Sequence, residues 1–190
     1  MNSLLNDLPQ LEMVWPQSRL TSPPLLKIPP NYILREYQPG DELRFYEVMA
    51  LSGWLGWDDK KLEPWLKRIP PRSWFMLVYQ PEQKIVATAM GLHDHTHWHP
   101  FGGELGWVAS DPDYRGIGLG AICCSAVVRR LLAAGYTNIH LYTEDFRLAA
   151  LKTYLRLGFT PRTETPAALE RWRIVCTAVG SPFTPDLWHS

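Results

Sequence analysis

The chain has 190 residues, of which 46% are hydrophobic and 20% are charged, and its 19 basic residues balance its 19 acidic ones. This composition is typical of a single folded domain and excludes an intrinsically disordered chain. The zero net charge gives no general electrostatic reason to expect a nucleic acid or an acidic membrane as partner.

No segment approaches the run of about 20 apolar residues that a membrane-spanning helix needs. No basic stretch followed by an apolar run marks a secretory signal. The three cysteines are odd in number, and Cys123 and Cys124 are neighbours in a segment with helical periodicity, so a disulfide framework is not expected. We therefore expect a cytoplasmic protein without a membrane partner, whose cysteines are small core or surface residues.

Residues 1–30 form a Pro-rich N-terminal arm that differs from the rest of the chain. Its prolines are Pro9, Pro16, Pro23, Pro24, Pro29 and Pro30. Proline fixes φ and lacks an N–H donor, so we expect neither a regular helix nor a central strand here. The arm is predicted to lie extended on the domain or to be partly disordered, and residues 31–190 are predicted to form the folded domain.

The hydrophobic pattern becomes regular from Tyr32 onward. Runs rich in β-branched and aromatic residues predict strands, and apolar residues at helical spacing predict helices. In chain order we expect a strand at 32–37, a helix from Asp41 through Met49, a helix at 60–69, strands at 73–79, 84–92 and 103–109, a helix at 121–134, a strand at 139–143, and helices at 147–157 and 167–179. Strands and single helices alternate in the second half, which predicts a layered α/β (α+β) fold.

The most informative segment is the loop at residues 115–120, Arg-Gly-Ile-Gly-Leu-Gly, directly before the helix predicted from Ala121. Glycine lacks Cβ, so backbone N–H groups can approach an anion closely. The first N–H groups of a helix have no internal acceptor, and the helix dipole is positive at that end. A phosphate would satisfy both, and Arg115 could pair with a phosphate oxygen.

Other interpretations of this loop are weaker. A Walker loop needs Lys-Ser or Lys-Thr after its last glycine, which is absent here. A dinucleotide-binding fingerprint matches formally, but the polar loop at residues 110–113 separates it from the preceding strand, and no strand ends in an acidic residue about 20 positions later. The interpretation of this loop as a glycine-rich turn that serves only to start the helix is left open.

Arg115, Gly118 and Gly120 match the [QR]-x-x-G-x-[GA] signature of the GNAT superfamily of acyl-CoA N-acyltransferases. The resemblance continues to Tyr-Leu-Arg-Leu-Gly-Phe-Thr-Pro at 154–161. It implies a mixed central sheet of about six to seven strands flanked by helices, with two parallel central strands that splay apart. It also implies acetyl-CoA as cosubstrate without a metal, a small-molecule or peptide amine as acceptor, and a monomer or homodimer.

The resemblance further assigns a cofactor site. The pantetheine arm would pair with the backbone like an added strand, and the helix start would hold the pyrophosphate. Arg147 stands where many relatives have an asparagine that contacts the cofactor, and an arginine there could serve a phosphate. The predicted cofactor-binding residues are Val108, Ala109, Ser110, Arg115, Gly116, Ile117, Gly118, Leu119, Gly120, Ala121 and Arg147.

Two residues are predicted to be catalytic. Tyr154 matches the tyrosine that the family places near the CoA sulfur as a general acid, although it could instead be a core residue. The attacking amine must lose a proton, and Glu104 at the start of a central strand is the first candidate base, with His99 as the alternative. A solvated carboxylate at a strand end is the other interpretation of Glu104.

Two further clusters stand out. Histidines at alternate positions could line one strand face as a metal site, but the Pro100 and Gly102-Gly103 that follow favour a hairpin connection, and we assign no metal ligand. These histidines are His93, His95, His97 and His99. Trp54, Trp57 and Trp65 fall in the region that borders the acceptor pocket in such folds, where they either form an apolar wall or pack in the core. Asp58 and Asp59 beside them could attract a cationic amine.

The sequence therefore leaves two functions open. The first is transfer of an acetyl group from acetyl-CoA to a primary amine by direct attack in a ternary complex. The second is a catalytically silent CoA-binding or interaction domain of the same fold. The acceptor itself is not identified by the sequence.

Overall fold

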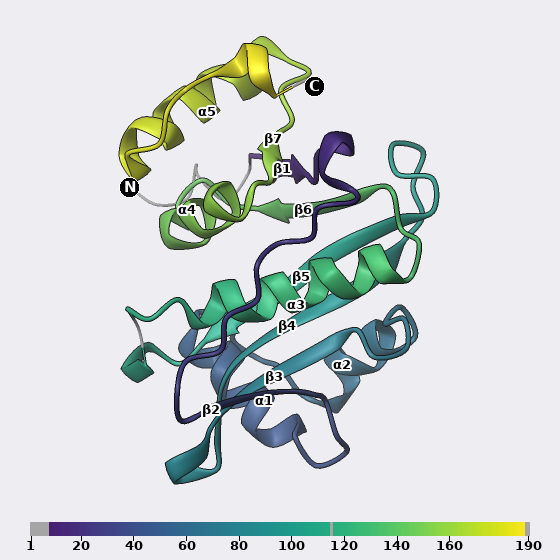
Figure 1. The fold of residues 1–190 in the computed structure, drawn as a ribbon, viewed down its shortest axis with the longest axis vertical. Coiled ribbons are helices and arrows are strands. Elements are labelled where there is room, and N and C mark those ends of the chain that lie inside the picture. The colour runs from purple at the N-terminus through teal and green to yellow at the C-terminus, as the bar shows by residue number, and fades with distance from the viewer. Residues whose placement is uncertain (1–7, 115, 189–190) are drawn as a thin grey trace.

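The computed structural model describes residues 8–114 and 116–188. In these residues a mixed seven-stranded sheet runs in the order β2-β3-β4-β5-β6-β1-β7 and is flanked by five α-helices (Figure 1). The strands are β1 (Leu11–Val14), β2 (Tyr32–Glu36), β3 (Trp74–Tyr79), β4 (Lys84–Asp94), β5 (Gly102–Ser110), β6 (Ile139–Thr143) and β7 (Thr160–Pro161). The helices are α1 (Glu42–Leu51), α2 (Asp59–Leu66), α3 (Leu119–Ala133), α4 (Leu148–Leu157) and α5 (Pro166–Val179). The predicted fold class is confirmed.

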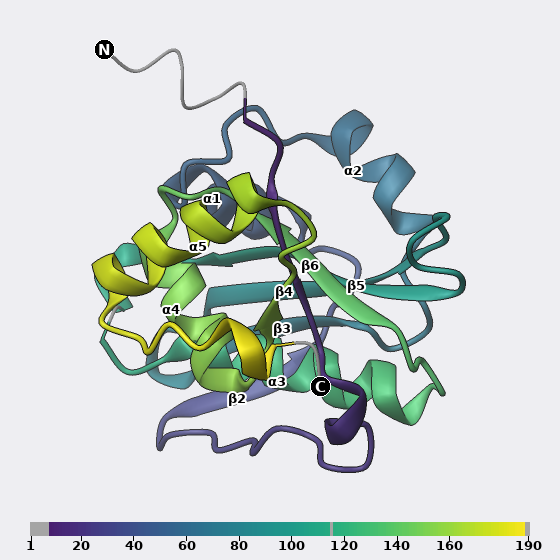
Figure 2. The ribbon, with the colours of Figure 1, turned by 90° about the horizontal axis from the view of Figure 1, so that it is seen from above.

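Helices cover both faces of the sheet, and α3 lies on the opposite side from α1 and α2 (Figure 2). One core cluster joins the sheet to α3, α4 and α5, and a second joins it to α1 and α2. Strand β4 is buried along most of its length because it lies between these two layers. This explains why its sequence is a continuous apolar run rather than an alternating one.

The two central parallel strands separate soon after they begin. Strands β5 and β6 pair in parallel at Gly103 with Ile139 and at Glu104 with His140. Strand β5 then continues to Ser110, with no further residue pair to β6 in the described chain. The predicted splay is confirmed, and it leaves one side of β5 open.

Strand β5 bulges within the open part. Gly106 pairs with Met90 and Ala109 with Thr88, so Trp107 and Val108 together stand opposite a single residue of β4. Trp107 adopts a φ of +49°, in the left-handed region that residues other than glycine rarely visit. A bulge of this kind bends a strand and changes the direction of its side chains.

Strand β1 corrects the prediction for the N-terminal arm, which was expected to contain no central strand. It pairs antiparallel with β6 on one side and with β7 on the other. Its four residues lie between Pro9 and Pro16, so no proline interrupts the ladder, and Leu11 and Met13 point into the core. After Arg19 the arm runs without regular secondary structure across the domain to β2, as predicted (Figure 1).

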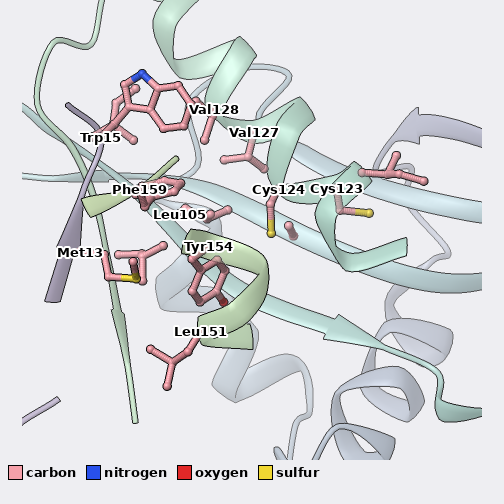
Figure 3. Packing of buried hydrophobic residues seen from close by; sticks show 14 of the residues in the cluster. Met13, Trp15, Leu105, Cys123, Cys124, Val127, Val128, Leu151, Tyr154 and Phe159 are labelled. Carbon is pink, nitrogen blue, oxygen red and sulfur yellow. The ribbon is translucent and has the colours of Figure 1, made fainter. Parts of the chain in front are cut away.

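The N-terminal strand and the C-terminal half meet in one core. Trp15 packs edge-to-face against Phe159, with ring centroids 5.2 Å apart, and Tyr154 lies in the same cluster as Cys124 (Figure 3). All three cysteines are buried and free, which confirms that they are core residues without a disulfide. None of the helices in the described residues has the length and apolar character needed to cross a membrane.

Helix α3 begins at the glycine loop. Its N-cap, Gly118, has a φ of +77°, and Gly116 before it has a φ of +94°. A Cβ on Gly118 would meet nothing within 4 Å, so the backbone conformation and not a lack of space requires glycine there. Gly120 lies in the first turn of the helix, where a Cβ would meet only Val108 Cγ1 at 4.0 Å.

The position of β1 predicts a stability difference within the arm. Met13→Ala should lower the free energy of unfolding by about 2–5 kcal/mol, because it removes a fully buried side chain. Leu25→Ala, at a residue that is 78% exposed, should change it by less than about 0.5 kcal/mol. Urea unfolding followed by tryptophan fluorescence measures both, and equal effects would show that β1 is not part of the folded core.

The glycine loop predicts opposite effects for two neighbouring substitutions. Gly118→Ala should lower the free energy of unfolding by about 1–2 kcal/mol, since a Cβ is strained in the left-handed conformation. Gly120→Ala should raise it by about 0.5–1 kcal/mol, since alanine loses less backbone entropy than glycine in a helix. Thermal and urea unfolding of the two variants test this, and a change of the same sign in both would contradict the loop conformation.

Candidate active site

A cleft of about 550 Å³ opens between the free side of β5, the start of α3 and the start of α4. The predicted cofactor-binding residues that line it are Val108, Ala109, Ser110, Gly116, Gly118, Leu119, Gly120, Ala121 and Arg147. Ile117 does not line the cleft, and its side chain is largely exposed. Arg115 lies outside the described residues. The structure thus gathers the predicted cofactor residues that it describes, except Ile117, around one cleft.

The backbone amides at the start of α3 are available to an anion. The amide of Ile122 donates to the carbonyl of Gly118 at 3.2 Å. Within residues 8–114 and 116–188, no acceptor is present for the amides of residues 116–121. Because the positive end of the helix dipole lies at the same place, this end of the cleft suits a phosphate group.

The backbone of β5 is only partly available along the cleft. Val108 has no Cα partner on β4 because of the bulge. The hydroxyl of Ser52, after the end of α1, accepts from the amide of Ser110 at 3.0 Å and donates to its carbonyl at 3.1 Å. The sequence does not predict this role of Ser52, because a serine at a helix end carries no signal of this contact. A ligand that lies along β5 therefore meets a Ser110 backbone that Ser52 already bonds.

A second cavity of about 270 Å³ is lined by residues of both splayed strands, β5 and β6. Its lining includes Gln10, Trp54, Trp65, Glu104, Gly106, Trp107, Tyr142 and Glu144. Four residues line both this cavity and the cleft, namely Val108, Arg147, Ala150 and Tyr154. The two spaces therefore meet where β5 and β6 separate. Tyr154 lies at that junction, whereas Glu104 lines only the second cavity.

Tyr154 is 6% exposed and packs on α4 at the junction. Burial raises the pKa of its hydroxyl, so the phenol keeps its proton over the whole physiological range. It is at once a core residue and a lining residue, so the two interpretations of its position do not exclude each other.

Glu104 is not a solvated carboxylate, because its side chain is only 16% exposed. Its Oε2 accepts from Arg68 Nη2 at 2.8 Å. Burial raises the pKa of Glu104; Arg68 opposes this effect and Asp94 adds to it. A carboxylate with a raised pKa is a stronger base than an ordinary glutamate, which suits proton abstraction.

Arg147 connects the two spaces. Its guanidinium stacks on Trp54 with Cζ 3.8 Å from the ring centroid, and its Nε donates to Glu144 at 2.8 Å. The side chain lines both the cleft and the second cavity. Arg147 is therefore held in place by protein groups and still faces both spaces.

The histidines do not gather into one site. They lie in and around the connection between β4 and β5, as predicted for a hairpin. His93 contacts the Tyr136 hydroxyl, and His95 accepts from the amide of Phe101. His99 is buried between Asn138 and Glu12 and lines neither space, so the geometry gives no support to His99 as the base.

The tryptophans gather around Trp107, at the bulge of β5. The rings of Trp54, Trp57 and Trp65 all meet it edge-to-face, at centroid distances of 5.3, 4.7 and 4.7 Å. Trp54, Trp65 and Trp107 line the second cavity, whereas Trp57 is buried in the core. Both interpretations of these tryptophans therefore apply: Trp54 and Trp65 form an apolar wall, and Trp57 packs in the core. The sequence predicts Trp107 only as part of the strand at 103–109.

The aspartates beside the tryptophans have structural partners. Asp58 caps α2 by accepting from the amide of Lys61, and Asp59 accepts from the Tyr46 hydroxyl. Neither aspartate lines the second cavity. The suggestion that they attract a cationic amine there is not supported.

Comparison with known proteins connects this geometry to a family. Residues 35–159 match the model of the acetyltransferase (GNAT) family. A mycothiol acetyltransferase from Nocardia farcinica is 31% identical over 154 residues, which cover 73% of this chain and 48% of that protein. One from Saccharopolyspora erythraea is 33% identical over 142 residues, with 70% and 45% covered. The chain spans about half the length of these relatives.

Solved structures share the fold. A GCN5-related N-acetyltransferase from Sphaerobacter thermophilus superposes with a TM-score of 0.60 at 23% identity, over 82% of this chain and 50% of that one. The ribosomal-protein-S18-alanine N-acetyltransferase from Escherichia coli gives a TM-score of 0.55 at 22% identity, over 70% and 79%. With the family match over residues 35–159 and the splayed strands described above, the chain belongs to the GNAT acetyltransferase family.

Proposed function

We propose that this chain is an N-acetyltransferase that moves the acetyl group of acetyl-CoA to a primary amine by direct attack in a ternary complex. The observation that carries the proposal is the junction of two spaces at Tyr154. The cleft presents amides for which the described residues 8–114 and 116–188 offer no acceptor and which suit a pyrophosphate, and the second cavity presents the buried carboxylate Glu104. One substrate can enter from each side and meet the other at the splay.

The cleft fits the cosubstrate. The amides of residues 116–121 would hold the pyrophosphate, assisted by Arg115 and Arg147. The pantetheine arm would lie along β5 and pair with the backbone at Val108, in the manner of an added strand. The thioester that it carries supplies an acyl group activated toward attack by an amine.

The chemistry needs one proton acceptor and one proton donor. Glu104 takes the proton of the amine as the C–N bond forms, directly or through one water molecule. Tyr154 gives a proton or a strong hydrogen bond to the thiolate as the C–S bond breaks. No step in this proposal uses a metal ion.

A covalent acyl-enzyme on cysteine is disfavoured. Burial raises the pKa of Cys123 to about 12 and also raises the pKa of Cys124 and Cys176. The thiolate is the nucleophilic form of cysteine, and burial suppresses it in all three. Direct attack is therefore the simpler route, and the free thiols also support a reducing cytoplasm as the location.

The second cavity restricts the acceptor. Its volume of about 270 Å³ admits a small molecule or the end of a peptide, and Trp54, Trp65 and Trp107 give it apolar walls. A primary amine that enters it would approach Glu104. The acceptor proposed here is therefore an amine on a small molecule or a peptide.

The direct test is acetyl-CoA binding by calorimetry, followed by an assay of CoA release with a panel of small-molecule and peptide amines. Release that depends on the amine would support the proposal. Tight binding of acetyl-CoA without transfer to any amine would instead favour a catalytically silent CoA-binding domain.

Tyr154→Phe tests the proton donor. The variant keeps the ring in the core and removes only the hydroxyl, so kcat should fall by about 10²-fold or more while the Kd for acetyl-CoA stays unchanged. Steady-state kinetics and calorimetry measure the two quantities. An unchanged kcat would remove Tyr154 from the mechanism.

Glu104→Gln tests the base. The kcat should fall by about 10²–10⁴-fold, because the amide cannot accept the amine proton. The base works only when deprotonated, so wild-type kcat should be lost as the pH falls through the raised pKa of Glu104. Glu63→Gln, at a side chain on α2 that is 68% exposed, serves as the control and should keep wild-type kcat. A Glu104→Gln enzyme with wild-type kcat would exclude Glu104.

A further inference from the structure

Arg68 bonds two carboxylates with a single nitrogen. Its Nη2 lies 2.8 Å from Glu104 Oε2 and 2.9 Å from Asp94 Oδ1. The two acidic residues come from neighbouring strands, β5 and β4, and their side chains are 16% and 18% exposed. One guanidinium nitrogen thus serves two largely buried anions.

The guanidinium is fixed by further contacts. Arg68 Nε donates to the carbonyl of His93 at 3.1 Å, and the amide of His93 donates to the carbonyl of Arg68 at 2.6 Å. Arg68 also lies over the ring of Trp65, with Cζ 4.9 Å from its centroid. The Nε contact and the Trp65 ring hold the guanidinium between the two carboxylates.

Asp94 is held from its other side. Its Oδ2 lies 3.1 Å from Nε2 of His140, a side chain that is fully buried. Burial lowers the pKa of His140, so this imidazole is neutral at neutral pH. The cluster of Arg68, Asp94, Glu104 and His140 therefore has two negative charges and one positive charge.

The two oxygens of Glu104 face different surroundings. Oε2 is bound to Arg68, whereas Oε1 lies beside Gly106, where a Cβ would come within 3.4 Å of it. Gly106 lines the second cavity together with Glu104. The arrangement anchors Oε2 at Arg68, whereas Oε1 lies beside a residue that lines the second cavity.

We propose that Asp94 is a positioning residue that shares the Arg68 guanidinium with Glu104, so that Glu104 stays fixed and still able to take the proton of the amine. The inference rests on the proposed function of Glu104 as the base. If the Arg68 guanidinium paired with Glu104 alone, it would stabilise the Glu104 anion more strongly and make Glu104 a weaker base. Loss of the guanidinium would leave two adjacent anions and favour protonation of Glu104.

Several other charged or titratable groups surround Glu104. His140 is its residue partner on β6, and Tyr142 of the same strand lines the same cavity. The connection between β4 and β5 contributes His99, which favours the charged form of Glu104. The segment after β6 and the start of α4 bring Glu144, Arg147 and Tyr154 to the cavity. These residues are not substituted in the variants below. In Asp94→Asn, His140 loses an anionic partner that raises its pKa, so its imidazole stays neutral there.

Two variants should shift the pH profile in opposite directions. Asp94→Asn keeps the shape of the side chain and removes its charge. The acid limb of the kcat–pH profile should therefore move to lower pH by about 1–3 units. The maximal kcat should also fall, because Glu104 becomes a weaker base. Arg68→Gln removes the cation, so the acid limb should move to higher pH. All profiles are measured with the same amine and with saturating acetyl-CoA, so that ionisation of the free amine affects each of them equally.

Conservative variants separate charge from structure. Asp94→Glu and Arg68→Lys keep the charges and should bring the acid limb back toward its wild-type position. An acid limb that stays at the wild-type pH in Asp94→Asn, or moves in the same direction in Asp94→Asn and Arg68→Gln, would overturn the proposal. Thermal unfolding shows which variants are folded, and Asp94→Asn alone decides the matter if Arg68→Gln does not fold.

A second readout does not require transfer activity. The side-chain carboxyl carbon of Glu104 can be followed by ¹³C NMR in labelled protein, and its signal is assigned by its loss in Glu104→Gln. The titration midpoint should fall in Asp94→Asn, and a midpoint equal to that of the wild type would overturn the inference. If no amine is acetylated but the midpoint falls, the proposed function fails while the sharing of Arg68 stands.

Discussion

The site depends on the early separation of β5 and β6. Two parallel strands that pair at only two positions leave backbone groups and side chains of both strands facing a wedge. The cleft and the second cavity both adjoin this wedge and meet at Tyr154. A fully paired sheet would close both spaces, because hydrogen bonds between the strands would take the backbone groups that a ligand needs.

Several features keep the wedge open. The bulge at Trp107 turns its ring toward Trp54 and Trp65, and these rings fill one wall of the second cavity. Strand β1 pairs with the outer side of β6, so β6 is a fully supported strand and not a free edge. The wedge is thus bounded on both sides by well-packed strands, which allows charged groups to be held at fixed places within it.

Charge inside the wedge is arranged by contacts between distant parts of the chain. Arg68 follows α2, Asp94 ends β4, Glu104 lies near the start of β5, and His140 lies on β6. A buried carboxylate needs a partner, and Arg68 supplies one for two carboxylates at once. The same contacts that make burial of Glu104 tolerable also decide how strongly it binds a proton.

The sequence by itself determined the local features. The glycine loop, the helix that follows it and the strands of the central meander are set by backbone conformation and by hydrophobic periodicity within short segments. The positions of Tyr154 and Gly158 also follow from one helix and its end. Tertiary structure alone decided the insertion of β1, the Ser52 contact and the sharing of Arg68. These depend on residues 26 to more than 100 positions apart, whose meeting follows from sheet order and packing rather than from any local pattern.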